Sequence, residues 1–205
     1  MTAFRIGFVP GVSPDKWAET WRRRSLGPLE LVPVEEPDQR AALTDGRVAM
    51  CFVRLPVERD GLHCIPLWHE RPVVVVPLEH VVTAYDEIDV AELAGEQVVY
   101  GAPAVLEPTV EQLPFPEMSA KDAIEVVASG TGVAVMPMSL ARLHHRKDVD
   151  YRFLLGVPET RIGLAWRVDD DDPRLETFVG IVRGRTENSS RDLQAPPKKP
   201  RKKRH

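Results

Sequence analysis

The sequence is poor in cysteine and contains no long apolar run. Its two cysteines, Cys51 and Cys64, are too few for a disulfide framework in a chain of 205 residues, and both lie in apolar stretches. We therefore expect two buried thiols. No apolar run approaches the roughly 18 residues of a membrane-spanning helix, and the N-terminus has neither the basic nor the apolar part of a secretion signal. These absences predict a cytoplasmic protein with one core or two small lobes.

Clusters of metal-ligating residues are also missing, and we predict neither a metal nor a cofactor. His63 and His69 flank an expected strand, and residues 144–145 form a histidine pair at a basic helix end, without the spacing of a metal site. The acidic run 169–172 lacks the glycine and distal glutamate of a calcium loop. No Ser/His/Asp or Cys/His constellation is evident, so the chain is not predicted to be an enzyme.

Charge is divided unevenly along the chain, although the net charge is only −4. Residues 191–205 hold seven Lys/Arg and one acid, a charge of +6, which leaves 20 basic and 30 acidic residues, or −10, in residues 1–190. The acidic body should repel nucleic acid. Residues 185–205 are expected to be a disordered basic tail. The tail could bind nucleic acid nonspecifically, contact an acidic partner or simply aid solubility; its basic residues are Lys198, Lys199, Arg201, Lys202, Lys203 and Arg204.

The first part of the chain predicts a β-α-β-α-β unit. Alternating apolar residues indicate strands at 4–9, 29–34 and 48–55, separated by helices at 13–24 and 37–45. This order is typical of a parallel sheet. Ser13 is placed as the N-cap of the first helix with Pro14 at its first position, and Trp17 and Trp21 share a helix face that should pack on the sheet.

The second part predicts more strands and short helices, interrupted by one long loop. The four valines at 73–76 indicate a strand that is buried on both faces. Residues 101–118 are proline-rich and without a helical pattern, so we expect a loop there. Ser119 and Asp122 resemble a capping box at the start of a helix that ends at Gly130. Further strands are expected at 62–67, 72–77, 97–100, 133–136, 151–155 and 161–168, and helices at 89–94, 139–145 and 172–183.

Several phrases together resemble the effector-binding domain of LysR-type bacterial transcription regulators. They occur in that family's order over nearly the whole body, at residues 4–10, 60–62, 66–80, 89–96, 128–137, 164–167 and 173–178. Each phrase alone is weakly specific, whereas the ordered set is specific. The resemblance implies an α/β, two-lobed type 2 periplasmic-binding-protein-like fold with mixed, mainly parallel sheets and two crossover strands. It further implies lobe one at residues 1–80 plus 162–184 and a shortened lobe two at 81–161.

The resemblance also implies a small-molecule effector in the cleft between the lobes, and helix N-termini there favour a carboxylate. The candidate ligand-binding residues are Gly11, Val12, Ser13, Arg54, Tyr100, Gly101, Ser119 and Thr131. Structural roles compete with this function: Ser13 and Ser119 as caps, Thr131 in a tight turn, and the pair at 100–101 as a strand end. Arg54 is expected at the surface slightly more than in the cleft as an anion partner.

Two departures from the family shape the functional hypotheses. The helical segment that the family carries before the helix beginning near Ser119 is replaced here by the proline-rich stretch, and the helix-turn-helix that precedes the family's effector domain is expected to be absent. We therefore expect a stand-alone sensor that regulates transcription through the tail or a partner, as a homodimer or in a heteromer with a regulator. The alternatives are an enzyme on the same fold, such as the prephenate dehydratases, whose Thr-Arg-Asp-Thr phrase is absent, and a scaffold that has lost its ligand.

Overall fold

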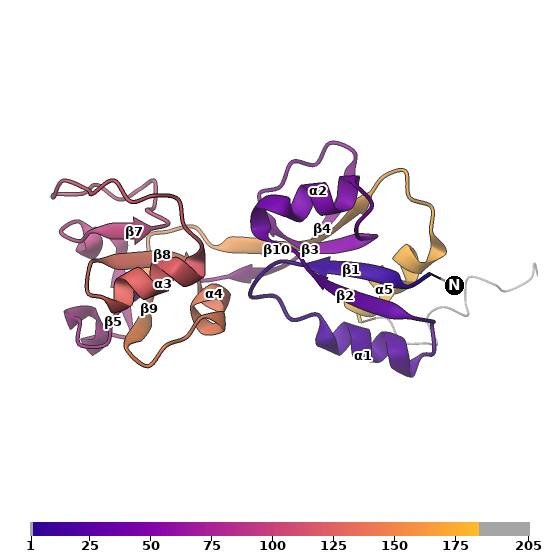
Figure 1. The fold of residues 1–205 in the computed structure, drawn as a ribbon, viewed down its shortest axis with the longest axis horizontal. Coiled ribbons are helices and arrows are strands. Elements are labelled where there is room, and N and C mark those ends of the chain that lie inside the picture. Colours follow the sequence, from indigo (N-terminus) through magenta and orange to yellow (C-terminus); the bar gives the residue numbers. More distant parts are fainter. Residues whose placement is uncertain (1, 185–205) are drawn as a thin grey trace, which may run out of the picture.

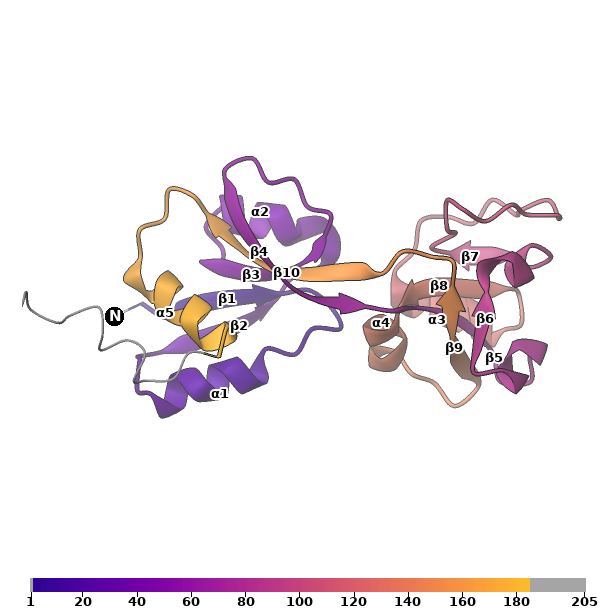
Figure 2. The same ribbon diagram turned by 180° about the vertical axis from the view of Figure 1, so that it is seen from behind.

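Two five-stranded sheets with short helices packed on them form the two halves of the molecule (Figure 1). The computed structural model describes residues 2–184. In the structure, lobe one is built on the first sheet and comprises residues 2–70 and 160–184, and lobe two is built on the second sheet and comprises residues 72–155. The chain passes between the lobes twice, directly after β4 (Leu62–Glu70) and directly before β10 (Thr160–Arg167) (Figure 2). β4 and β10 are therefore the two crossover strands of the predicted two-lobed α/β fold.

The sheet of lobe one has a parallel half and an antiparallel half. Its strands in spatial order are β2 (Leu29–Pro33), β1 (Phe4–Phe8), β3 (Met50–Leu55), β10 (Thr160–Arg167) and β4 (Leu62–Glu70). β1 pairs in parallel with both β2 and β3, which confirms the predicted β-α-β-α-β unit. β10 lies antiparallel between β3 and β4, and its Leu164 pairs with Phe52 on one side and Ile65 on the other.

Aromatic side chains hold two of the helices of lobe one against this sheet. The helices of this lobe are α1 (Asp15–Arg23), α2 (Gln39–Thr44), which continues the short 3-10 helix η1 (Glu36–Asp38), and α5 (Pro173–Val182). Trp21 stacks on Phe4 with ring centroids 5.1 Å apart, and Trp17 stacks on Phe52 at 4.8 Å. The predicted packing of the two tryptophans on the sheet is confirmed, and stacked aromatic pairs add to the free energy gained by burial.

The start of α1 differs from the prediction. Pro14 occupies the N-cap position without a side-chain hydrogen bond, and α1 begins at Asp15. Ser13 Oγ donates a hydrogen bond to Asp15 Oδ2 at 2.6 Å and does not accept one from a helix N–H group. The predicted cap at Ser13 is therefore wrong: the helix starts one position later than the proline-based prediction places it, and the Asp15 carboxylate accepts the hydrogen bond of the Ser13 hydroxyl.

The sheet of lobe two is also mixed. Its strands in spatial order are β6 (Glu87–Asp89), β9 (Val149–Leu155), β5 (Pro72–Pro77), β8 (Val133–Pro137) and β7 (Val98–Tyr100). The central β5 is antiparallel to β8 and β9, whereas the outer pairs β6–β9 and β7–β8 are parallel. Among the described residues, antiparallel pairs are thus as frequent as parallel ones, a larger share than expected, because β5 and β10 run against their neighbours on both sides.

Short helices complete lobe two. They are η2 (Val81–Ala84), η3 (Val90–Leu93), α3 (Ala120–Ala128) and α4 (Met138–Leu143). The predicted N-cap at Ser119 is confirmed, because Asp122 N donates to Ser119 Oγ at 3.2 Å. The Asp122 carboxylate accepts from the Ser119 hydroxyl at 2.8 Å and not from the Ser119 backbone N–H, so the reciprocal half of the predicted capping box is not formed. The helix ends near Gly130, whose φ of +82° suits glycine.

The boundary between the two sheets differs from the predicted one. We expected residues up to 80 in lobe one, but β5 pairs entirely within the second sheet, and the chain changes sheets at Arg71. The valines at 73–76 are buried, as their sequence predicts. A strand buried on both faces suits the centre of either sheet, so its apolar pattern carries no information about which lobe holds it.

The proline-rich segment 101–118 forms no helix or strand and covers the β7 edge of the sheet, as expected for a loop. Two glutamine amides attach it. Val98 N donates to Gln112 Oε1, and Leu113 N donates to Gln97 Oε1, each at 2.9 Å. The first of these bonds satisfies a backbone N–H group of β7 that an exposed edge strand would present to other chains.

Candidate functional site

A cleft of about 1800 Å³ lies between the two lobes. Lobe one contributes the loop after β1 (residues 10–13) and the end of β2 with the segment after it (residues 33–37). The crossover contributes residues 68–71, and lobe two contributes Tyr100 and residues 117–122, 138–140 and 142–144. Binding pockets for small ligands typically measure about 300–1,000 Å³, so this cleft has room for a small ligand and for movement of its walls.

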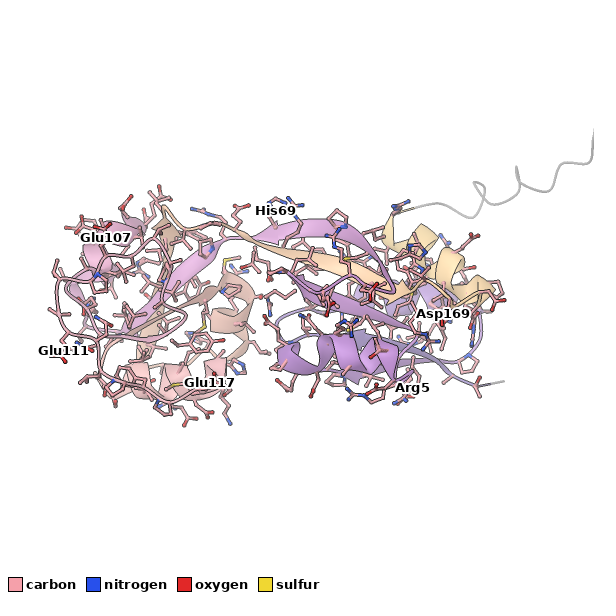
Figure 3. The ribbon with its side chains drawn as sticks, turned by 90° about the horizontal axis from the view of Figure 1, so that it is seen from above. Arg5, His69, Glu107, Glu111, Glu117 and Asp169 are labelled. Carbon is pink, nitrogen blue, oxygen red and sulfur yellow. The ribbon has the colours of Figure 1, made fainter. Side chains whose placement is uncertain are left out.

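The topology explains why these segments meet. The loops after β1 and β2 leave the carboxyl ends of two parallel strands, and α3 begins on the opposite wall. Ligands of open parallel sheets collect at this edge, where backbone N–H groups of helix starts also point. His69 lies on the crossover strand beside the cleft and Glu117 on the lobe-two wall (Figure 3).

Arg54 lies directly behind the cleft wall, and its guanidinium is buried. Its side chain is 4% exposed, so the expected surface position is wrong. Nη1 donates to Glu36 Oε2 at 2.7 Å, and Nη2 donates to Glu70 Oε2 at 3.1 Å. Glu70 is as buried as Arg54, at 7%, whereas Glu36 is 45% exposed and faces the cleft. Two carboxylates therefore share one cation, and the group carries a net charge of −1.

The remaining donors of Arg54 fix the adjoining loops. Nη2 also donates to the carbonyl of Pro10 at 3.1 Å, and Nε donates to Glu70 at 3.3 Å. The side-chain amide of Gln39 forms two hydrogen bonds with the Arg54 backbone. Arg54 N donates to Gln39 Oε1 at 2.9 Å, and Gln39 Nε2 donates to the Arg54 carbonyl at 3.0 Å. Arg54 thus positions the loop that follows β1 and the segment that precedes α2.

The two lobes touch at Ser139. Its hydroxyl accepts a hydrogen bond from Arg54 Nη2 at 3.3 Å. Gly11, which has a φ of +86°, packs so closely here that a Cβ atom would lie 2.5 Å from Ser139 Oγ. The glycine is required by both its backbone conformation and this contact. Its loop therefore packs directly against the start of α4.

Charged side chains face one another across the cleft. Burial lowers the pKa of His144, Lys121 lowers it further, and Glu35 from the opposite lobe raises it. Burial also raises the pKa of the Tyr100 phenol, Glu36 raises it further, and Arg54 opposes this. Each shift involves a charge from lobe one acting on lobe two, so the walls are within electrostatic range of each other.

Five of the predicted residues line this cleft: Gly11, Val12, Ser13, Tyr100 and Ser119. Arg54 stands directly behind the wall through its bonds to Glu36 and Ser139. Gly101 and Thr131 do not line it. Gly101 has a φ of +67° and lies against the Val135 carbonyl, and Thr131 Oγ1 is 2.8 Å from Ser129 Oγ in the turn after α3. Gly101 therefore has a role in the backbone conformation, and Thr131 has a role in the turn after α3.

Sequence inspection missed Trp68, Glu36, Glu70 and Ser139. Trp68 stacks on Trp17 with centroids 5.9 Å apart and also lines the cleft. A detectable signal existed for residues 68–71, because a strand that crosses between lobes must border the space between them. The roles of Glu36 and Ser139 depend on pairings over 18 and 85 residues of chain, for which no local pattern exists.

The remaining predictions from the sequence concern parts of the protein other than this cleft. The six basic tail residues Lys198, Lys199, Arg201, Lys202, Lys203 and Arg204 lie outside the described residues. Within residues 2–184, no group of three or more His, Cys, Asp or Glu side chains could hold a metal ion. In the same part of the chain, no helix has the length and apolar character needed to cross a membrane.

Comparisons with known proteins agree with this geometry. The family model described as "LysR substrate binding domain" matches residues 28–187. The Hca operon transcriptional activator HcaR of Escherichia coli K12 is 27% identical over 197 residues, which are 88% of this chain and 67% of that protein. The HTH-type transcriptional regulator CatR of Pseudomonas putida is 30% identical over 195 residues, 86% of this chain and 66% of that regulator. The chain thus spans about two thirds of the length of these two relatives.

A solved structure shows the same fold. The effector binding domain of BenM with its effector benzoate superposes with a TM-score of 0.69 at 21% identity, over 95% of this chain and 96% of that domain. The agreement over both chains confirms the predicted two-lobed α/β fold class.

Proposed function

The chain belongs to the family of LysR substrate-binding domains, and on that premise we propose that it senses a small-molecule effector, expected to be a carboxylate, in the cleft between its lobes. The single observation that carries the proposal is the cleft itself, bordered by the carboxyl ends of β1 and β2 on one side and by the start of α3 on the other. Because the named relatives are transcription regulators, we infer that the chain acts in regulation, in the cytoplasm, and not as an enzyme.

A carboxylate is supported by the lobe-two wall. The first turn of α3 presents backbone N–H groups, Lys121 follows the Ser119 cap, and Arg142 lies on α4. Helix N-termini and cations both favour anions. The benzoate bound by the similar BenM domain is itself a carboxylate.

The output of binding is a change in how the lobes sit on each other. A ligand that contacts both walls shifts the population toward the state in which both sets of contacts form. The lobes are joined by two strands and touch at Ser139, so closure of the cleft is a hinge movement about this contact. The change in lobe arrangement is transmitted to a regulator partner, to a second copy of this chain, or to nucleic acid bound by the basic tail.

Thermal unfolding with added carboxylates tests the sensing function. The full chain is melted with millimolar benzoate, 3-phenylpropanoate, butyrate and succinate, beside a Ser13→Trp variant that fills the exposed mouth of the cleft. We expect at least one compound to raise the melting temperature of the natural chain and not that of the variant. Equal shifts in both proteins, or no shift with any compound, contradict sensing in this cleft.

We also propose that residues 198–204, in which six of seven side chains are basic, bind nucleic acid weakly and without sequence preference. Fluorescence anisotropy with labelled duplex DNA compares the full chain, a chain ending at Arg191, and a full-length chain with the six basic residues changed to serine. Salt-sensitive binding should be lost in both altered chains. Unchanged binding after the deletion contradicts the role of the tail.

A further inference from the structure

We propose that the ligand of the cleft is a zwitterion, such as an amino acid, whose ammonium group binds Glu36 beside Tyr100 and whose carboxylate lies at the start of α3 near Lys121. This inference rests on the proposed sensing function and narrows the chemical class of the effector. It follows from the distribution of charge over the two walls of the cleft.

The lobe-one wall is negative and has no cation to offer. Its charged lining residues are Glu35, Glu36 and Glu70, and the Arg54 guanidinium behind them is bonded through all three of its nitrogens. A ligand carboxylate that approached this guanidinium would compete with the carboxylates of Glu36 and Glu70, which already bind it. Even with Arg54 included, the wall carries a charge of −2, which disfavours a purely anionic ligand.

Glu36 supplies an acceptor for a cation. Its Oε2 accepts the hydrogen bond from Arg54, and among residues 2–184 no hydrogen bond involves its Oε1. A carboxylate accepts about four hydrogen bonds, so Glu36 retains capacity for a ligand with several donors. A primary ammonium, with three N–H donors, has this chemistry.

Tyr100 faces the same position from lobe two. Its phenol is half-buried, and the charge of Glu36 acts on it across the cleft. A phenol oxygen accepts a hydrogen bond, and an aromatic face attracts a cation. Glu36 and Tyr100 together therefore suit an ammonium group held between the lobes.

The opposite wall suits the anionic end. α3 is a nine-residue helix whose Ser119 cap and first turn border the cleft, and its Lys121 is exposed there. The lining residues Lys121 and Arg142 balance Glu117 and Asp122 on this wall, and Arg71 of the crossover, which pairs with Glu87, adds one positive charge beside it. Asp122 is engaged by the Ser119 hydroxyl, and Lys121 supplies a cation in the first turn of α3.

Matched sets of ligands test the inference by titration calorimetry on the full chain. The panel holds the common amino acids together with, for each, the analogue that lacks the amine and the analogue that lacks the carboxylate; phenylalanine, 3-phenylpropanoate and 2-phenylethylamine form one such set. We expect at least one amino acid to bind tenfold or more tightly than both of its analogues.

Variants connect this preference to Glu36. Glu36→Gln should weaken binding of the preferred amino acid tenfold or more and leave its amine-free analogue unaffected or bound more tightly. Glu107→Gln, at the outer end of lobe two (Figure 3), is the control and should bind as the natural chain does. Melting of each variant without ligand verifies that the fold is retained.

The outcomes separate the inference from the function on which it rests. If carboxylates bind as tightly as their amino acids, or Glu36→Gln leaves the amino acid bound as before, the zwitterion is wrong and sensing of a carboxylate stands. If no compound of the three kinds binds, both the zwitterion and the proposed sensing function are overturned.

Discussion

Arg54 of lobe one donates a hydrogen bond at 3.3 Å to Ser139 of lobe two, a residue that lines the cleft. The same guanidinium nitrogen, Nη2, also bonds Glu70 and the carbonyl of Pro10. A single side chain thus ties together the loop that borders the cleft, a crossover strand and the first residues of α4. Any ligand that moves the lobes must alter the surroundings of this group.

Removal of Arg54 should be costly. Arg54→Met leaves the buried Glu70 carboxylate without its cation, and breaking a buried pair in this way costs about 3–5 kcal/mol of unfolding free energy. Urea unfolding measures the loss. Arg5→Met, which removes an exposed pair with Glu30, is the matched control and should cost about 1 kcal/mol or less. Equal losses in the two variants would show that Arg54 is not held as a buried ion pair.

Gly101 should tolerate no side chain, for structural reasons. Its φ of +67° disfavours other residues, and an added Cβ would collide with the Val135 carbonyl. Gly101→Ala should therefore destabilise the chain by about 1–3 kcal/mol in chemical denaturation. Gly95→Ala, at a glycine with open space and without a positive φ, should change the unfolding free energy by about 0.5 kcal/mol or less. Equal effects of the two substitutions contradict this placement of Gly101.

Asp172 should stabilise α5 in a pH-dependent way. Its carboxylate caps the helix by accepting from Arg174 N at 2.9 Å, and the hydrogen bonds from the Arg174 side chain lower its pKa. A lowered pKa in the folded state means that the stabilisation is complete above the unfolded value, about 3.9, and is lost as the pH falls through the folded value.

Asp172→Ala should thus cost about 1–2 kcal/mol at neutral pH, and the difference from the natural chain should shrink below about pH 3.9. Urea unfolding across this range measures it. Asp172→Asn separates the cap from the charge, and Asp171→Ala, at an exposed neighbour, is the control. A cost that stays constant down to pH 2 would contradict a role for the ionised carboxylate.

The two thiols should differ in reactivity. Burial raises the pKa of the Cys51 thiol to about 12. Burial also raises the pKa of the Cys64 thiol, but the positive charge of Arg59 opposes this increase. Because the thiolate is the reactive form, Cys51 should react with a disulfide reagent at pH 8 at least about a hundredfold more slowly than an unperturbed thiol. Rates for Cys51→Ser and Cys64→Ser assign the two phases, and denaturant should remove the difference. A fast reaction in the Cys64→Ser variant would contradict the burial of Cys51.

Local chemistry was predictable from the sequence in most places, the cap expected at Ser13 being an exception, and long-range pairing was not. The Ser119 cap of α3 and the shared face of Trp17 and Trp21 depend on neighbours within four positions, and both were confirmed. The surface position expected for Arg54 was wrong because its partners Glu36, Glu70 and Ser139 approach it only after the sheets form.

The cleft was predicted in part for the same reason. Gly11 and Ser13 follow β1, and Tyr100 ends β7; each position is at the carboxyl end of a parallel strand in its own sheet, and all three residues line the cleft. The expected boundary after residue 80 failed because β5 is equally apolar on both faces, and only its pairing partners assign it to the second sheet.

The most direct test of small-molecule sensing in this cleft is titration calorimetry with the compound that stabilises the natural chain most. Affinity is compared for the natural chain, for Ser13→Trp at the mouth of the cleft, and for Leu78→Trp at an exposed position outside it. We predict that Ser13→Trp weakens binding tenfold or more and that Leu78→Trp binds as the natural chain does. Unchanged affinity in Ser13→Trp would place the ligand elsewhere and contradict the cleft as the sensing site.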